Sequence, residues 1–166
     1  MGNANNQNLY FPLLKHWFRY AGIALLFLGA ISGYLYFWGG KPDFLTTKVF
    51  AILTSYMETR TFVVAQTNML DEIAAIFLIL GLIFIAFSSE KNEKPELNAL
   101  RIKALVYAVF ITSGFWIVCF LFIYGWPVFL FATSVFPLFL LAFIVGFRIM
   151  IFKFHKNNKN NHFVKN

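Results

Sequence analysis

The sequence has one cysteine, Cys119, and few acids: seven Asp and Glu stand against 14 Lys and Arg in 166 residues. One cysteine cannot build an intrachain disulfide framework or a cysteine-based metal site. The sequence also lacks a Gly-Lys-Ser/Thr phosphate loop, a Gly-x-Ser-x-Gly turn and a histidine pair at metal-ligand spacing. We therefore expect no enzyme activity, no catalytic residue, no cofactor and no bound metal.

Charge is also absent from four long stretches of the chain. None of them contains Asp, Glu, Lys, Arg or His, and they cover residues 20–38, 73–88, 104–124 and 128–147. The composition is 60% hydrophobic and 20% aromatic, which is more apolar surface than a soluble domain of this size can bury. Lipid is therefore the expected solvent for these stretches.

The length of the apolar stretches predicts how they cross the lipid. About 20 apolar residues in a helix span a hydrocarbon core of roughly 30 Å, and the first, third and fourth stretches meet that length. Because the stretches show no period-2 alternation, helices are favoured over the strands of a barrel. The predicted fold is an all-α membrane protein with four transmembrane helices in an antiparallel bundle.

The basic residues predict the orientation of this bundle. In a four-span chain only Lys41, Lys48 and Arg60 fall on one side of the membrane, and the other eleven Lys and Arg fall on the opposite side. By the positive-inside rule both termini and the loop at residues 89–103 are cytoplasmic. The net charge of +7 is then a topology signal, and we expect no nucleic-acid partner. The predicted location is the bacterial cytoplasmic (inner) membrane.

These boundaries divide the chain into a transmembrane domain with two polar ends. The predicted parts are a mobile polar N-terminus at 1–16, a transmembrane domain at 17–152 with spans at about 20–38, 72–89, 104–124 and 128–148, an outer loop at 39–70, a cytoplasmic loop at 89–103, and a basic polar cytoplasmic tail at 153–166.

The outer loop is the longest predicted segment outside the lipid. Its apolar residues Val49, Ile52, Leu53, Tyr56 and Met57 recur at helical spacing, which predicts a short amphipathic helix in the outer interface over 46–59. Residues 61–64 are rich in β-branched side chains and could be extended, but four residues are too few to decide it. Asn68 or Asp71 is expected to cap the second span.

Two groups of residues are candidates for contacts. Gly29 and Gly33 form a Gly-x-x-x-Gly pair, which permits close approach of two helices within the bundle or between subunits. The charged candidates flank the spans, and they are Glu58, Arg60, Asp71, Glu72, Arg101 and Lys103. The outer members of this group could bind a cation or a partner, but helix capping is the favoured interpretation of Asp71 and Glu72.

A segment of the chain is similar to known sequences. Asp-Glu opens the second span, Ala-Phe-Ser-Ser-Glu-Lys closes it at 86–91, and Leu-Arg-Ile-Lys-Ala-Leu opens the third at 100–105. This segment, about a fifth of the chain, resembles a family of small, uncharacterised bacterial four-span integral membrane proteins. Ser89 stands where their lysine usually does, and residues 92–95 depart from their acidic run. The resemblance implies the same topology and no activity.

These observations favour a non-enzymatic accessory, regulatory or assembly subunit of a membrane complex. Its expected partners are the lipid bilayer and either a protein partner or further copies of itself. The alternative is a homo-oligomeric small pore or membrane-perturbing effector, for example a membrane accessory of an RNA-targeting CRISPR defence system.

Overall fold

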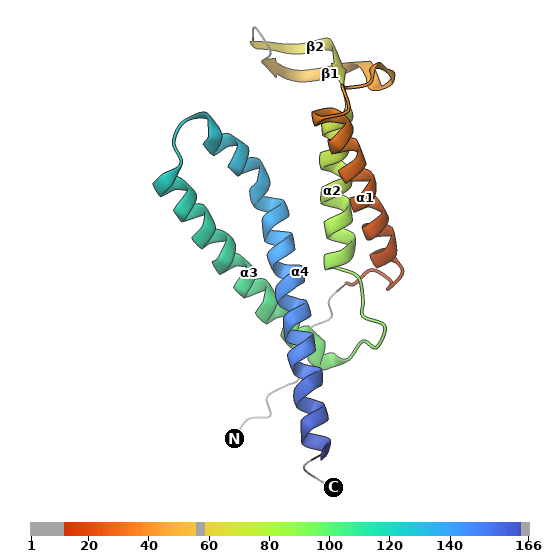
Figure 1. Cartoon of the computed structure of the whole chain (residues 1–166), viewed down its shortest axis with the longest axis vertical. Coiled ribbons are helices and arrows are strands. Elements are labelled where there is room, and N and C mark those ends of the chain that lie inside the picture. Colours follow the sequence, from red (N-terminus) through yellow and green to blue (C-terminus); the bar gives the residue numbers. More distant parts are fainter. Residues whose placement is uncertain (1–11, 56–58, 164–166) are drawn as a thin grey trace. The chain divides into compact units, whose positions relative to one another are not determined.

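A computed structural model describes residues 12–55 and 59–163 (Figure 1). These residues form four α-helices and one small sheet. The helices are α1 (Phe18–Phe37), α2 (Leu70–Ala86), α3 (Pro95–Phe122) and α4 (Trp126–Phe163). A 3-10 turn, η1 (Asp43–Leu45), leads into strands β1 (Thr46–Ser55) and β2 (Thr59–Asn68). The chain divides into two compact units, which are described separately below.

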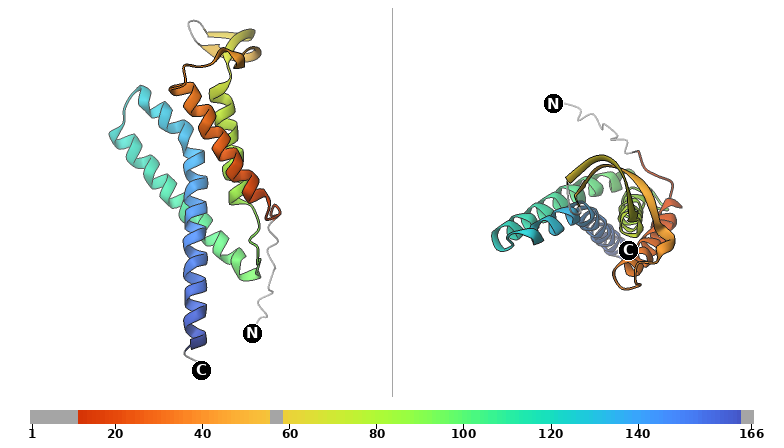
Figure 2. Two further views of the ribbon diagram at one scale, coloured as in Figure 1. Left: turned by 45° about the vertical axis from the view of Figure 1, so that its right-hand side comes forward. Right: turned by 90° about the horizontal axis from the view of Figure 1, so that it is seen from above.

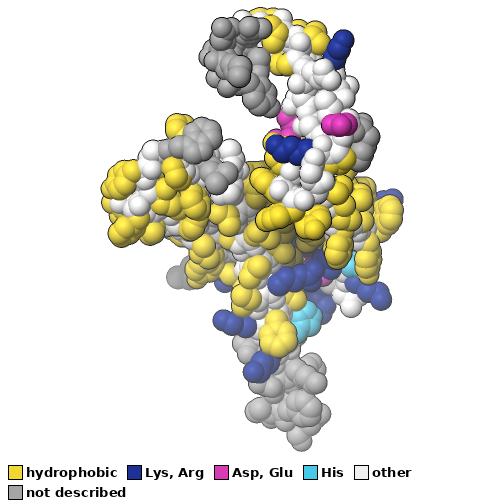
Figure 3. All heavy atoms as spheres, turned by 45° about the horizontal axis from the view of Figure 1, so that its top comes forward, with side chains coloured by type: hydrophobic (Ala, Val, Ile, Leu, Met, Phe, Trp, Pro, Cys, Tyr) yellow, Lys and Arg dark blue, Asp and Glu magenta, His cyan; other side chains and the backbone are white. Residues whose placement is uncertain are grey.

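Three of the helices are long and apolar enough to cross a membrane. They are α1, α3 and the part of α4 from Pro127 to Lys156. Large hydrophobic side chains on these helices are exposed to the surroundings, and Figure 3 shows them covering much of the molecular surface. This is the composition of a membrane protein, because lipid accepts apolar side chains that water would not. Helix α2 has 17 residues and is not among the helices long enough to cross a membrane.

The predicted all-α fold is corrected by the sheet. Strands β1 and β2 pair as an antiparallel hairpin, with Thr46 opposite Asn68 and Ser55 opposite Thr59. The amphipathic helix predicted over 46–59 is therefore wrong for 46–55, and residues 56–58 lie outside the described chain. Thr and Val are frequent in both strands, and this β-branched composition outweighs a helical spacing of five apolar residues. Residues 61–64, which the sequence left undecided, lie within β2.

The first unit, residues 21–81, contains most of α1, the hairpin and the start of α2, and we call it the hairpin unit. Its helices pack through glycine. A Cβ added at Gly29 would lie 3.2 Å from the carbonyl oxygen of Ala74, and one added at Gly81 would lie 2.9 Å from that of Gly22. The helices are therefore in backbone contact at two levels.

Hydrogen bonds connect the hairpin to the start of α2 and to the residues between α1 and β1. The Asn68 side-chain oxygen accepts a hydrogen bond from the Leu70 amide (3.1 Å), which confirms Asn68 as the cap of α2. The Asn68 Nδ2 group donates to the Pro42 carbonyl at 3.0 Å, and the Met69 amide donates to the Leu45 carbonyl at 3.2 Å. The end of β2 is thus hydrogen-bonded to Pro42 and Leu45, which lie just before β1.

The second unit comprises residues 1–20 and 82–166, and we call it the α3–α4 unit. Helix α3 begins at Pro95, within the predicted cytoplasmic loop, because proline suits the first helical position and needs no amide partner there. A turn with Gly125 at φ +76° joins α3 to α4. The two helices are close together near Ala104 and Ala108, which are completely buried, and separate toward the turn (Figures 1 and 2).

The structure describes part of each predicted end segment. Residues 1–11 lie outside the described chain, but Leu14 of the predicted mobile N-terminus forms a parallel bridge with Ser88. Its amide donates to the Phe87 carbonyl at 2.9 Å, and its carbonyl accepts from the Ser89 amide at 2.8 Å. At the other end, α4 continues to Phe163 through most of the predicted tail. Pro137 lies inside α4, and the helix changes direction along its first half (Figure 1).

Candidate functional site

The α3–α4 unit contains a cluster of paired charges, which we call the charged junction. It consists of Arg19, Glu90, Glu93, Arg101 and Arg148. Arg19 binds Glu90 in a bidentate pair, with nitrogen–oxygen distances of 2.6 and 3.2 Å, and Arg148 approaches the same carboxylate at 3.4 Å. The junction therefore joins α1, the α2–α3 loop and α4 through one glutamate.

Arg101 is the most buried member of the charged junction. Its side chain is 3% exposed, and both terminal nitrogens donate to Glu93, Nη2 to Oε2 at 3.0 Å. Its guanidinium carbon lies 4.8 Å from the centre of the Phe147 ring, a cation–π contact between α3 and α4. From the sequence, Arg101 was a candidate contact for a partner. The structure instead directs it into the unit, because its helical position is on the buried face of α3.

The pKa of Glu93 reflects this pairing. Partial burial raises it, but the hydrogen bonds from Arg101 and from the Glu90 amide outweigh burial and hold the pKa below its ordinary value of 4.5. The Glu90 amide donates to Glu93 at 2.8 Å, so the loop is folded around its own carboxylate. Each carboxylate of the junction is engaged by arginine. This suits a structural clamp at the end of the helices.

The other predicted contact residues are dispersed. Lys103 is exposed on α3, and Asp71 and Glu72 lie in the first turn of α2. Arg60 pairs with Thr54 in the hairpin. Glu58 lies outside the described residues. The described residues contain no group of three or more His, Cys, Asp or Glu that could hold a metal ion.

The two predicted packing glycines have different surroundings. Gly29 is buried against the backbone of α2, whereas a Cβ added at Gly33 would meet only the Ala74 Cβ, at 4.0 Å. Gly29 thus packs within the chain, and Gly33 has room for a small side chain. The contact of Gly22 with Gly81 was missed, since the two residues are 59 positions apart and belong to no short motif.

The hairpin carries an uncovered apolar surface. Phe50, Ile52 and Val64 occupy alternate positions of the two strands, and the ring of Phe62, whose backbone has φ +52°, lies beside that of Phe50. These four side chains are 65 to 71% exposed, and we call them the aromatic face. Phe50 is opposite Val64 in the register, and the Phe50 and Phe62 rings are 6.3 Å apart. This face was not predicted, because the helical spacing of apolar residues in 46–59 indicated a helix.

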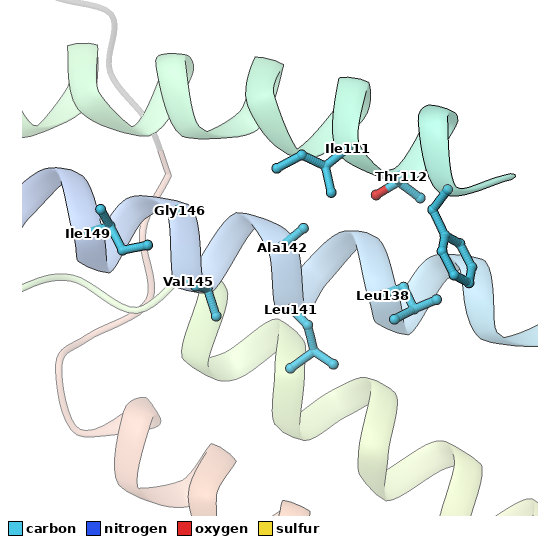
Figure 4. Close-up of a pocket in the computed structure, with 9 residues that line it drawn as sticks. Ile111, Thr112, Leu138, Leu141, Ala142, Val145, Gly146 and Ile149 are labelled. Atoms are coloured by element: carbon cyan, nitrogen blue, oxygen red, sulfur yellow. The ribbon is translucent and has the colours of Figure 1, made fainter. Parts of the chain in front are cut away.

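The α3–α4 unit also contains an apolar groove with a volume of about 420 Å³ (Figure 4). It lies between the two helices, on the side of the turn where they separate. Its lining residues are Ile111, Thr112, Phe115, Leu138, Leu141, Ala142, Val145, Gly146 and Ile149. This volume is in the range of small-ligand sites, and nearly all of the lining is hydrocarbon.

Thr112 supplies the hydroxyl group of this α3–α4 groove. The residue is 8% exposed, and Figure 4 places it on α3 at the groove. Its Oγ1 atom is buried and has no hydrogen-bond partner among the described residues. An unpaired buried hydroxyl is costly in an apolar environment. The Oγ1 atom lies beneath the groove surface, so an occupant can hydrogen-bond to it once the Thr112 side chain turns toward the groove.

Comparisons with known proteins add no relationship. No protein-family model, curated protein sequence or solved structure matches the chain. The resemblance to small four-span membrane proteins therefore stays a prediction. The features that bear on function are the α3–α4 groove, the charged junction and the hairpin.

Proposed function

We propose that this protein is a non-enzymatic accessory or assembly subunit of a membrane complex, and that the α3–α4 groove receives a transmembrane helix of a partner protein. The observation that carries the proposal is the unpaired Thr112 hydroxyl in an otherwise apolar groove. Helices in lipid associate through close packing and through hydrogen bonds of residues such as threonine. The groove offers both kinds of contact.

The depth of Thr112 distinguishes a helix from a phospholipid as the occupant. Thr112 lies about 12 Å along α3 from Ala104, where the apolar stretch begins, which is close to the middle of a hydrocarbon core of roughly 30 Å. A phospholipid has only hydrocarbon at that depth and cannot satisfy the hydroxyl. A transmembrane helix brings serine, threonine or asparagine side chains to the same depth.

The proposed membrane arrangement includes a fourth span. Helix α2 is shorter than the others, but no charged residue or histidine follows Glu72 in it, and Gly29 and Gly81 pack it closely on α1. At 1.5 Å per residue its 17 residues extend about 26 Å, and a modest thinning of the bilayer accommodates such a length. With four spans, the excess of basic residues puts both termini in the cytoplasm of a bacterium.

A photocrosslinking experiment tests the proposed function. A photoreactive amino acid replaces Leu141 in the groove, and a control protein carries it at the exposed Val118 of α3, outside the groove lining. After irradiation of native membranes, we expect Leu141 to yield a discrete adduct with one other membrane protein. Val118 should yield none or a diffuse set.

Substitutions at Thr112 make this test specific. We expect Thr112→Val, which removes the hydroxyl at nearly constant volume, to reduce the Leu141 adduct severalfold, and Thr112→Ser to retain it. An adduct with a second copy of the 19.2 kDa chain would favour the homo-oligomer instead. Adducts with lipid alone, unaffected by Thr112→Val, would reject a protein occupant.

A further inference from the structure

The aromatic face of the hairpin presents a problem of stability. Phe50, Ile52, Phe62 and Val64 together place two aromatic and two β-branched side chains on one side of a sheet that has only two strands. A two-stranded sheet is marginally stable in water and usually needs a further layer on its apolar face. Among the described residues none covers this face, so its covering lies outside the chain that the structure describes.

The attachment of the hairpin restricts what that covering can be. Strand β2 ends at Asn68 and α2 begins at Leu70, while η1 is the last element before β1. The Asn68 side chain binds the Pro42 carbonyl and the Leu70 amide, so the base of the hairpin is fixed to the start of α2 and to the loop that follows α1. This loop is held to the end of α1 by a hydrogen bond from the Lys41 amide to the Leu35 carbonyl, at 3.3 Å. Figures 1 and 2 show the strands running across these helix ends instead of continuing along their axes.

This direction matters because α1 is long and apolar enough to cross a membrane. A segment that runs across the end of such a helix runs along the membrane surface. At the same end of α1, Tyr34, Phe37 and Trp38 are 63 to 77% exposed, and Tyr34 stacks on Trp38. Exposed aromatic rings at a helix end are typical of the headgroup region. Lipid is therefore the apolar phase within reach of the hairpin.

We propose that the aromatic face is inserted into the headgroup and upper acyl region of the leaflet in which α1 ends, so that the hairpin is an in-plane membrane anchor. Phe50, Ile52, Phe62 and Val64 contact lipid. The opposite face, with the smaller Val49, Ala51, Val63 and Ala65, faces away from the acyl chains. Shallow insertion leaves the unpaired backbone groups of both strand edges in a hydrated layer, where water satisfies them.

Depth measurement with a fluorescent label tests the proposed insertion. Single cysteines replace Ile52 or Val64 on the aromatic face, and matched cysteines replace Ala51 or Ala65 on the opposite face, all in a full-length Cys119→Ser background. Each cysteine carries an NBD fluorophore, and the protein is reconstituted in phosphatidylcholine vesicles. We expect blue-shifted emission at 52 and 64, quenched most strongly by phospholipids brominated near the headgroup end of the acyl chain. At 51 and 65 we expect emission typical of water.

A second measurement establishes that the hairpin itself has formed. Val49 and Ala65 are opposite each other in the register, so a Val49→Cys/Ala65→Cys pair should form a cross-strand disulfide in the same vesicles. Three results would overturn the proposal. They are the absence of that disulfide, water-like emission at all four labelled sites, or shielding of 52 and 64 that appears in native membranes but not in pure lipid. The last result would assign the aromatic face to a protein partner.

Discussion

At the residue scale, the charged junction shows why the two residues of one ion pair need not contribute equally to stability. Arg101 is 3% exposed, whereas its partner Glu93 is 33% exposed. Loss of the carboxylate leaves a buried guanidinium without a counter-charge, whereas loss of the guanidinium leaves a carboxylate that can turn toward water. Replacing Arg101 by an apolar side chain should therefore lower the free energy of unfolding less than removing the charge of Glu93 does.

The asymmetry gives a prediction for two substitutions. Glu93→Gln should lower the free energy of unfolding by about 2 kcal/mol, because it removes a charge-assisted pair from a buried cation. Arg101→Met should cost less than half as much, since methionine can still pack on Phe147. Unfolding in detergent micelles, followed by circular dichroism, measures both values. The double variant should resemble Arg101→Met alone, and equal costs for the two single variants would contradict the argument.

The lowered pKa of Glu93 predicts a dependence of stability on pH. The folded pKa lies below the ordinary value of 4.5, so the unfolded chain binds the proton more readily between the two values. The stabilisation from Glu93 is complete above pH 4.5 and is lost as the pH falls through the folded pKa. The midpoint of thermal unfolding of the wild type should therefore fall further than that of Glu93→Gln between pH 6 and pH 3. Parallel curves would exclude Glu93 as a source of the acid sensitivity.

At the scale of the elements, glycine determines how closely α1 and α2 pack. A Cβ at Gly81 would meet the Gly22 carbonyl at 2.9 Å, so the helices would have to separate. A Cβ at Gly33 would lie in ordinary contact with Ala74. The Gly-x-x-x-Gly motif consists of Gly29, with a 3.2 Å approach, and Gly33, but the tighter approach belongs to Gly81, which lies outside the motif.

Alanine substitutions separate these glycines. Gly81→Ala should destabilise the chain by about 1 to 3 kcal/mol through overpacking against backbone, and Gly33→Ala should be nearly neutral. Resistance to thermal unfolding in nanodiscs is the measurement. An equal loss at both positions would mean that Gly33 also packs tightly, as in an interface between subunits. Gly33 is thus the better position at which to test self-association, because substitution of Gly29 or Gly81 disturbs the monomer.

At the scale of the whole molecule, the proposed topology depends on whether α2 crosses the membrane. Cysteines at Ser55 and Asn92 lie before and after α2, and they can be labelled separately in a Cys119→Ser background. With four spans, an impermeant maleimide added to intact cells should label position 55 and not position 92. Labelling of both positions would place them on the same side and show that α2 does not span.

The charged junction could have been anticipated in part from the sequence. Leu97, Arg101, Ala104, Ala108 and Thr112 follow one another at intervals of three or four residues, so a helical wheel places them on one face of α3, and all five are buried. A face otherwise made of small or apolar side chains is a signal that Arg101 points inward. Its partners were not predictable, because Glu90, Arg19 and Arg148 come from segments whose proximity depends on the fold.

The sequence by itself determined that this is a chain of apolar helices suited to lipid. Long stretches without charge and without period-2 alternation favour helices there, so α1, α3 and α4 could be predicted, and Asn68 was one of two candidates for the cap of α2. Tertiary structure decided the rest. Local patterns were ambiguous for β1, which is a strand because it pairs with β2. The Gly22–Gly81 contact, the charged junction and the groove at Thr112 each join residues that are far apart in the sequence and that only packing brings together.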